Sequence, residues 1–267
     1  MKTPVKTIEV LDIPFAQITQ ADALDVLENF LRQTRNHVIV TPNPEGVMQA
    51  RRNPAFAEAL RSADLSLADG TGIVLASRAK GRPLPERVRG MDTTFALFER
   101  LNARLSAGRK PDAEIISDAT GEGFSVYFLG GAPGIAERAG ANMAAKFSAL
   151  KVAGCHHGFF SPESNEESQI LAEINAAAPD ILLVCMGMPR AELWAARNRN
   201  INARLTLCVG GTIDIMAGTI NPAPAFMRKI GLEWLWRLIR QPRRAARMLD
   251  IPRFIAAVIF GRDSESS

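Results

Sequence analysis

The most constraining feature of this sequence is a repeated succession of a short apolar run, a corner that contains glycine, and a stretch of helix-forming residues. The clearest apolar runs are 65–68, 124–129, 181–186 and 205–209, with a shorter run upstream at 38–40. Because these runs are continuously apolar rather than alternating, they predict strands that are covered on both faces, as in a parallel sheet between helices.

The segments that follow these runs favour helices, since they are rich in helix formers or begin just after a proline. Helices are expected at 45–52, 55–63, 73–79, 135–147 and 191–198. Strands that alternate with helices in this way predict an α/β fold, with a Rossmann-like sheet core and helices on both faces.

The charge of the chain is unevenly distributed. From residue 222 onward there are nine basic and four acidic residues, whereas residues 1–221 hold 23 basic and 24 acidic ones. Two tryptophans, Trp234 and Trp236, lie among these arginines, and the apolar run 254–260 is too short to cross a bilayer but suited to an interface. We therefore expect an α/β catalytic core over 1–221 and a helical, basic, amphipathic appendage over 222–267, facing a membrane, a nucleic acid or an anionic ligand.

Hydropathy and cysteine content indicate the compartment. The chain has no uncharged apolar stretch of about 18 residues and no apolar segment behind its first residues, so neither a spanning helix nor a signal peptide is expected. Three cysteines, Cys155, Cys185 and Cys208, lie in apolar runs, which favours buried free thiols over disulfides. These features predict a cytoplasmic protein.

The glycine corners are the candidate ligand sites, because ligands of open α/β sheets bind at the carboxyl ends of the strands. Gly130 and Gly131 open the corner best suited to phosphate, since a backbone without side chains can approach the ligand and a helix follows at once. The corner departs from the G-x-G-x-x-G pattern, and a plain structural turn is the alternative.

Polar side chains beside these corners each have two interpretations. Asp69 follows an apolar run and is a candidate general base, or else the N-cap of the next helix. Asp214 has the same ambiguity, whereas Thr41 and Asn43 either offer polar contacts to a ligand or build the turn between two prolines.

No metal site is expected. His156 and His157 are neighbours, but His37 is the only other histidine, and the chain has no Cys-x-x-Cys, no His-x-x-x-His and no Asp-x-Asp pair. An anionic substrate must then be bound by helix N-termini and arginines such as Arg87.

Seven motifs, read together and in order, closely resemble the WecG/TagA/CpsF family of bacterial glycosyltransferases. They are the segments 41–45 (TPNPE), 63–72 (ADLSLADGTG), 85–92 (PERVRGMD), 128–131 (FLGG), 156–160 (HHGFF), 192–194 (ELW) and 231–235 (GLEWL). The resemblance covers essentially the whole chain.

The resemblance implies an inverting, metal-independent transfer of a sugar, typically of the N-acetylmannosamine type, from a UDP-sugar to a polyprenyl-diphosphate-linked sugar. Such a reaction belongs to the biosynthesis of cell-surface polysaccharide or teichoic-acid-type polymers, at the inner face of the cell membrane. The enzyme would act there as a peripheral protein that needs no cofactor. No nucleic-acid partner is implied, and homo-oligomerisation is left open.

The resemblance also assigns roles to residues. Asp69 corresponds to the proposed base, with Thr41 beside it, and Arg87 to an active-site arginine. The remaining residues expected to bind substrate are Asn43, Gly70, Gly72, Gly130, Gly131, Asp214 and, in the appendage, Arg237, Arg244 and Arg247. The appendage would close these arginines over the diphosphate and hold the enzyme on the membrane.

One departure bears on substrate choice. Family members commonly have Ser-Pro-Lys-Gln-Glu where this chain has Met-Pro-Arg-Ala-Glu at 188–192, so Ala191 replaces an amide expected near the substrate. Another UDP-hexose or a hexuronic acid is therefore the alternative donor.

Two other classes of protein remain as rivals to this interpretation. They are a dinucleotide-dependent oxidoreductase and a non-catalytic adaptor that binds a membrane or a nucleic acid. Neither class accounts for Asp69, Arg87 and the glycine corners together.

Overall fold

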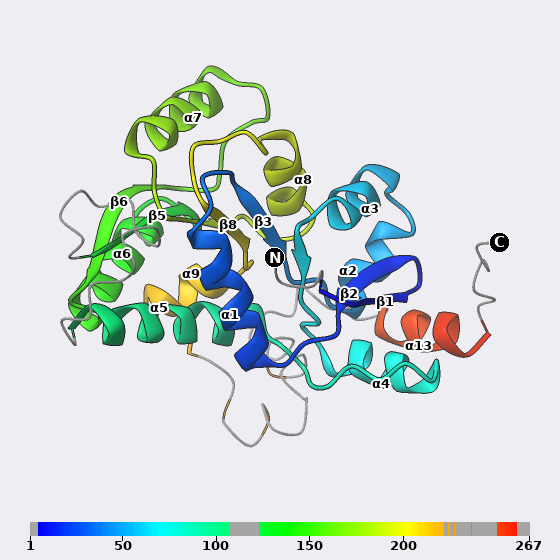
Figure 1. Cartoon of the computed structure of the whole chain (residues 1–267). Helices are drawn as coiled ribbons and strands as arrows, with labels where there is room; N and C mark the ends of the chain where they lie inside the picture. Colours follow the sequence, from blue (N-terminus) through cyan, green and yellow to red (C-terminus); the bar gives the residue numbers. More distant parts are fainter. Residues whose placement is uncertain are drawn as a thin grey trace.

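A computed structural model describes residues 5–106, 123–221 and 250–260, together with positions 224, 227 and 236. Within these residues six strands form one parallel sheet in the order β4-β3-β8-β7-β5-β6, and β1 and β2 pair as a separate antiparallel hairpin (Figure 1). The strands are β1 (Thr7–Val10), β2 (Ile13–Ala16), β3 (His37–Val40), β4 (Leu65–Ser66), β5 (Phe124–Gly130), β6 (Leu150–His156), β7 (Ile181–Cys185) and β8 (Leu205–Cys208).

Helices cover both faces of this sheet (Figure 1). They are α1 (Gln20–Leu31), α2 (Pro44–Ala50), α3 (Pro54–Arg61), α4 (Thr71–Ala79), α5 (Gly90–Ser106), α6 (Ile135–Lys146), α7 (Asn165–Ala177), α8 (Arg190–Arg197), α9 (Thr212–Met216) and α13 (Asp250–Phe260). The predicted α/β architecture, with a parallel sheet between helices, is confirmed.

The two faces of the sheet belong to separate apolar cores. Along β7, Ile181 and Leu183 pack into the core formed with α1, α5, α6 and α9, whereas Leu182 and Val184 pack into the core formed with α2, α3, α7 and α8. Alternate residues of a strand point to opposite faces, so a strand buried on both sides must be apolar throughout. The uninterrupted runs in the sequence have this physical origin.

The five apolar runs are all strands, and the five predicted helices are all present, with ends shifted by a few residues. Strand β6 was not predicted, because it lies at the edge of the sheet and its residues are partly exposed. Its Gly154 resembles a turn residue in the sequence, but a Cβ there would lie 2.4 Å from the ring of Tyr127 in β5. That glycine allows close packing between neighbouring strands.

The N-terminal hairpin and α1 were also not predicted. The hairpin turn uses Leu11 and Asp12 with positive φ angles, where a sequence signal would have required glycine or asparagine. The start of α1 did carry a signal, since Thr19 and Asp22 form a capping box.

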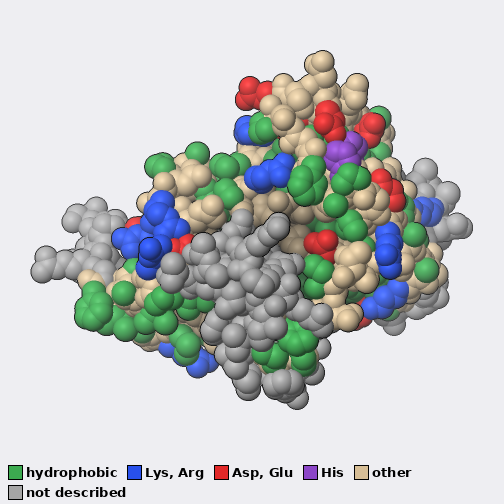
Figure 2. All heavy atoms as spheres, turned by 180° about the vertical axis from the view of Figure 1, so that it is seen from behind, with side chains coloured by type: hydrophobic (Ala, Val, Ile, Leu, Met, Phe, Trp, Pro, Cys, Tyr) green, Lys and Arg blue, Asp and Glu red, His purple; other side chains and the backbone are tan. Residues whose placement is uncertain are grey.

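Of the expected appendage, the structure describes α13 in full, and the other predictions for residues 222–267 lie largely outside the described residues. Phe254 of α13 is buried among residues of α2 and α4, whereas Ile255, Ile259 and Phe260 are 51, 66 and 82% exposed. In Figure 2 hydrophobic side chains gather at the left edge of the molecule, in the region of α13 and α4. Within the described part of the chain, no helix has the length and apolarity needed to cross a bilayer.

Free cysteines were expected, and all three are free. Cys185 and Cys208 are buried, and burial raises the pKa of Cys185 to about 12. Cys155 is only half-buried, because β6 is an edge strand.

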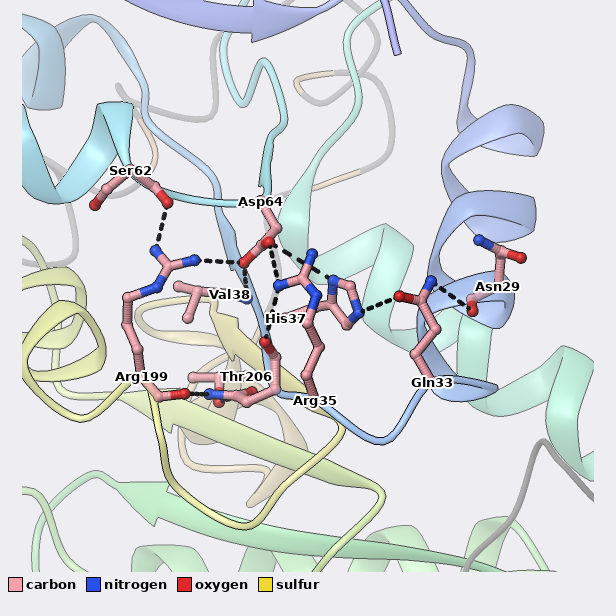
Figure 3. A network of polar contacts seen from close by, with 10 residues as sticks. Asn29, Gln33, Arg35, His37, Val38, Ser62, Asp64, Arg199 and Thr206 are labelled. Carbon is pink, nitrogen blue, oxygen red and sulfur yellow. Dashed lines mark hydrogen bonds and ion pairs between the residues drawn. The ribbon is translucent and has the colours of Figure 1, made fainter. Parts of the chain in front are cut away.

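A polar network holds the amino ends of β3, β4 and β8 together, at the edge of the sheet away from the glycine corners (Figure 3). Asp64 accepts hydrogen bonds from Arg35 (2.7 Å), Arg199 (2.8 Å) and the backbone N–H of Val38 (2.9 Å). Although burial opposes ionisation, these donors together with His37 hold the pKa of the Asp64 carboxyl well below its usual range. This network therefore joins three strands at the end of the sheet opposite the candidate site.

Candidate active site

A cavity of about 870 Å³ opens at the carboxyl ends of β3, β4, β7 and β8. Its walls come from these strand ends, from α2 and α4, and from α13. Its charged lining residues within the described chain are Glu45, Arg52, Asp69, Arg87, Glu192, Asp250 and Arg253. The cavity therefore lies where α/β sheets bind ligands.

The two motifs on the β3 and β4 sides of the cavity are packed directly against each other. A Cβ at Gly70 would lie 2.9 Å from Cδ of Pro44, and a Cβ at Gly72 would lie 2.7 Å from Cγ of the same ring. Since real Cβ contacts are not this short, both glycines are needed for the beginning of α4 to approach Pro44. This contact sets the position of Asp69, which directly precedes Gly70.

Asp69 and Thr41 meet at the first residue of α5. The backbone N–H of Gly90 donates to Oδ2 of Asp69 at 3.4 Å, and a Cβ on Gly90 would lie 2.8 Å from Cγ2 of Thr41. The hydroxyl of Thr41 donates to the carbonyl of Cys208 at 3.1 Å. The N-cap of α4 is Gly70 and carries no side-chain capping bond, so the N-cap interpretation of Asp69 is wrong.

Arg87 and Asn43 also line the cavity. Arg87 donates from Nη1 to the hydroxyl of Thr71 at 3.3 Å, which places its guanidinium beside the first residue of α4. Asn43 is the N-cap of α2, and its Oδ1 accepts from the N–H of Gly46 at 2.9 Å. Asn43 thus has a structural role as a helix cap, and its contact with substrate stays a prediction.

Gly130, Gly131 and Asp214 are not among the residues that line the cavity. A Cβ at Gly130 would lie 2.5 Å from the carbonyl oxygen of Cys185, so glycine is required there to let β5 pass β7. Asp214 lies in the first turn of α9, which follows the cavity-lining corner at Gly211. The substrate roles expected for these three residues stay predictions.

The sequence did not indicate which residues hold α13 against the cavity. Asp250 forms a two-pronged ion pair with Arg52, with distances of 2.9 and 2.6 Å, and a further bond of 3.3 Å with Arg253. The hydrogen bonds from Arg52 lower the pKa of Asp250. No local pattern could reveal this pair, because its members are 198 positions apart. The predicted arginines Arg237, Arg244 and Arg247 lie outside the described residues.

His156, His157 and Glu166 form the one group of three potential metal ligands in the part of the chain that is described. Figure 2 shows histidine side chains among acidic ones on the surface. Nδ1 of His157 accepts from the N–H of Phe159, so in the neutral ring Nε2 carries the proton and faces Glu166 at 3.5 Å. This geometry suits a hydrogen bond to the carboxylate, and the expectation of no bound metal stays a prediction.

Comparisons with known proteins support the resemblance seen in the motifs. The model of the glycosyl transferase WecG/TagA/CpsF family matches residues 8–110 and 112–266. An N-acetylglucosaminyldiphosphoundecaprenol N-acetyl-beta-D-mannosaminyltransferase of Bacillus spizizenii is 28% identical over 95% of this chain and 90% of its own length. A protein of the same name from Staphylococcus aureus is 27% identical over 93% of this chain and 90% of its own length.

Proposed function

Because the chain belongs to the WecG/TagA/CpsF family of glycosyl transferases, we propose that it transfers an N-acetylmannosamine-type sugar from a UDP-sugar to a polyprenyl-diphosphate-linked N-acetylglucosamine. The names of the two relatives support the transferred sugar and the acceptor. This family membership makes the chain a hexosyltransferase and removes the oxidoreductase and the adaptor from consideration.

The observation that carries the proposal is that Asp69, Thr41 and Arg87 all line the same cavity. These residues come from three separate segments, and two of them are held by contacts with Gly90. The fold therefore brings three polar side chains from distant parts of the sequence to a cavity that a substrate can enter. A carboxylate, a hydroxyl and a guanidinium in one cavity suit a transfer that moves a proton and releases an anion.

In the proposed reaction the acceptor hydroxyl attacks C1 of the sugar from the face opposite UDP. The new C–O bond forms as the bond from C1 to the diphosphate oxygen breaks, so the anomeric configuration inverts. Asp69 accepts the hydroxyl proton, and base assistance of this kind accelerates a reaction by about 10²–10⁴-fold. Thr41, beside Asp69, would orient the carboxylate or the attacking hydroxyl.

The leaving group of this reaction is the diphosphate of UDP, whose charge must be stabilised. Arg87 lines the cavity, and α4 begins beside it with an N-cap, Gly70, that makes no side-chain capping bond. Both features favour an anion at this place. We propose that these groups, joined by the expected arginines of the appendage, act without a metal ion.

The acceptor is attached to a lipid, and the exposed apolar residues beside the cavity fit that chemistry. Ile255 and Ile259 of α13 and Leu75 of α4 line the cavity and are exposed. We propose that this surface rests on the inner face of the cell membrane and presents the cavity to the acceptor. The change Phe260→Ser should weaken binding to anionic liposomes while turnover on a short-chain soluble acceptor is kept, and unchanged liposome binding would contradict this role.

The overall proposal is tested by incubating the purified protein with a panel of UDP-sugars and a synthetic polyprenyl-diphosphate N-acetylglucosamine, with and without EDTA. We expect transfer from UDP-N-acetylmannosamine, undiminished by EDTA, and a product of inverted anomeric configuration. Transfer of a different hexose or a hexuronic acid would correct the donor. A requirement for divalent ions, or a product with retained configuration, would contradict the mechanism.

A further inference from the structure

The ELW motif at 192–194 has no role in the reaction described so far, yet its glutamate lines the cavity. Glu192 lies in the first turn of α8, which follows β7 and packs into the apolar core through Trp194 and Ala195. The residue is only 4% exposed. Glu192 therefore lies in the deep part of the cavity, where a carboxyl group is costly to bury unless it is hydrogen-bonded.

Within the described residues, Oε2 of Glu192 has no hydrogen-bond partner. Burial raises the pKa of the Glu192 carboxyl to about 7 and so favours its neutral form. Buried side-chain oxygens in folded proteins nearly always have a partner. An unpartnered oxygen in the lining of a cavity indicates that a ligand supplies the missing bond.

The neighbouring residues of α8 cannot provide this contact. Arg190 donates to the carbonyls of Gly158 (2.8 Å) and Phe160 (3.2 Å), which directs its guanidinium away from the cavity. Ala191 is buried and is not among the cavity-lining residues. Among the first three residues of α8, Glu192 alone offers a polar side chain to the cavity.

The chemistry of a neutral carboxyl group restricts what it can bind. It presents an O–H donor and a carbonyl acceptor side by side, which matches a hydroxyl or an amide. A diphosphate suits it poorly, because an ionised Glu192 would repel the phosphates. The cation Arg87, which also lines the cavity and lies beside the first residue of α4, is the better partner for a diphosphate. The group that Glu192 fits is an uncharged polar substituent of the sugar.

We propose that Glu192 is a specificity-determining residue whose carboxyl group hydrogen-bonds a hydroxyl or the acetamido group of the transferred sugar. This inference rests on the proposed function, since it takes the ligand of the cavity to be a sugar nucleotide. It adds a second contact region, on the β7 and β8 side of the cavity, to the region around Asp69 on the β4 side.

The test compares binding of UDP and of UDP-N-acetylmannosamine by isothermal titration calorimetry. Glu192→Leu should weaken binding of the sugar nucleotide by about 10–100-fold, the range expected for a lost hydrogen bond to a buried group, and leave UDP affinity unchanged. Glu167→Gln is the matched control, because Glu167 is equally buried but lies in α7 and pairs with Arg197 outside the cavity.

A second variant keeps the test decisive if Glu192→Leu does not fold. Glu192→Gln retains a donor and an acceptor but cannot ionise, so its sugar-nucleotide affinity should stay flat between pH 6 and 8, where wild-type affinity should fall as pH rises. Among the residues that the structure describes, the other ionisable side chains packed near Glu192 or sharing the cavity are Cys208, Glu45, Arg52, Asp69, Arg87, Asp250 and Arg253. All of these residues are the same in wild type and in Glu192→Gln, so a difference between the two pH profiles of affinity is due to Glu192.

The outcomes separate this inference from the proposed function. If wild type binds neither UDP nor the sugar nucleotide, the proposed function fails. If wild type binds both, the inference about Glu192 is overturned by equal losses for the two ligands in Glu192→Leu, by no loss, or by identical pH profiles for wild type and Glu192→Gln.

Discussion

The contact between Gly72 and Pro44 allows a direct test of the claim that the packing of α4 against Pro44 positions Asp69. Gly72 lies in the first turn of α4, where alanine would ordinarily stabilise a helix by about 0.5–1 kcal/mol relative to glycine. The Cβ of an alanine would, however, lie 2.7 Å from Cγ of a proline ring that cannot rotate away. Overpacking of this kind costs about 1–3 kcal/mol.

We therefore expect Gly72→Ala to lower the free energy of unfolding by about 1–2 kcal/mol, or the melting temperature by about 3–6 °C in a chain of this size. Its larger effect should be on turnover, because relief of the clash moves Asp69 relative to Thr41. A displacement of about 1 Å in a catalytic group can reduce the rate about 100-fold.

The control is Pro44→Ala, which removes the ring atoms that the new methyl group would meet. In that background Gly72→Ala should become neutral or stabilising, which gives a coupling free energy of about 2 kcal/mol in a double-mutant cycle measured by urea unfolding. Turnover of the double variant should exceed that of Gly72→Ala alone. Additive effects of the two substitutions would refute the claim that this contact positions Asp69.

Three further predictions concern other parts of the fold. Asp64→Asn should lower the free energy of unfolding by about 2–4 kcal/mol at pH 7, because it weakens several charge-assisted hydrogen bonds. Since the folded-state pKa of Asp64 is depressed, the stabilisation that Asp64 gives is complete above its unfolded-state pKa of about 4 and is lost as the pH falls below that value. The free energy of unfolding in urea should therefore depend less on acid pH in Asp64→Asn than in wild type. The same acid dependence in both proteins would contradict this. Asp250→Asn should loosen α13 through its pair with Arg52, seen as faster amide exchange in α13 and a higher KM for the donor, whereas unchanged exchange would exclude this anchor. Gly130→Ala should greatly reduce the yield of folded protein, because its Cβ would overlap the carbonyl of Cys185, and a fully stable variant would show that β5 and β7 can separate there.

The central sheet was predictable because a strand that is buried on both faces is apolar at every residue. Ile181, Leu182, Leu183 and Val184 are all apolar, since alternate members serve opposite cores. Edge strand β6 is not continuously apolar, because part of it faces solvent. Its Gly154 is needed because the ring of Tyr127 in β5 packs against it, which the sequence of β6 alone does not show.

The candidate site was predictable to the extent that its residues lie in local corners. Asp69, Thr41 and Arg87 were found from strand ends and motifs, and all three line the cavity. The sequence could not show that Asp250 pairs with Arg52, because that contact depends on where α13 docks. The burial of Glu192 was equally hidden, since a glutamate in a helix is ordinarily exposed.

The most direct test of the catalytic account is a comparison of wild type with Asp69→Asn, which preserves the shape of the side chain and removes its ability to accept a proton. Transfer to the polyprenyl-diphosphate acceptor would be followed by release of UDP, and donor affinity by calorimetry. The account predicts that kcat falls at least about 100-fold while donor affinity changes by less than about threefold. Near-normal turnover by Asp69→Asn would contradict the assignment of Asp69 as the base.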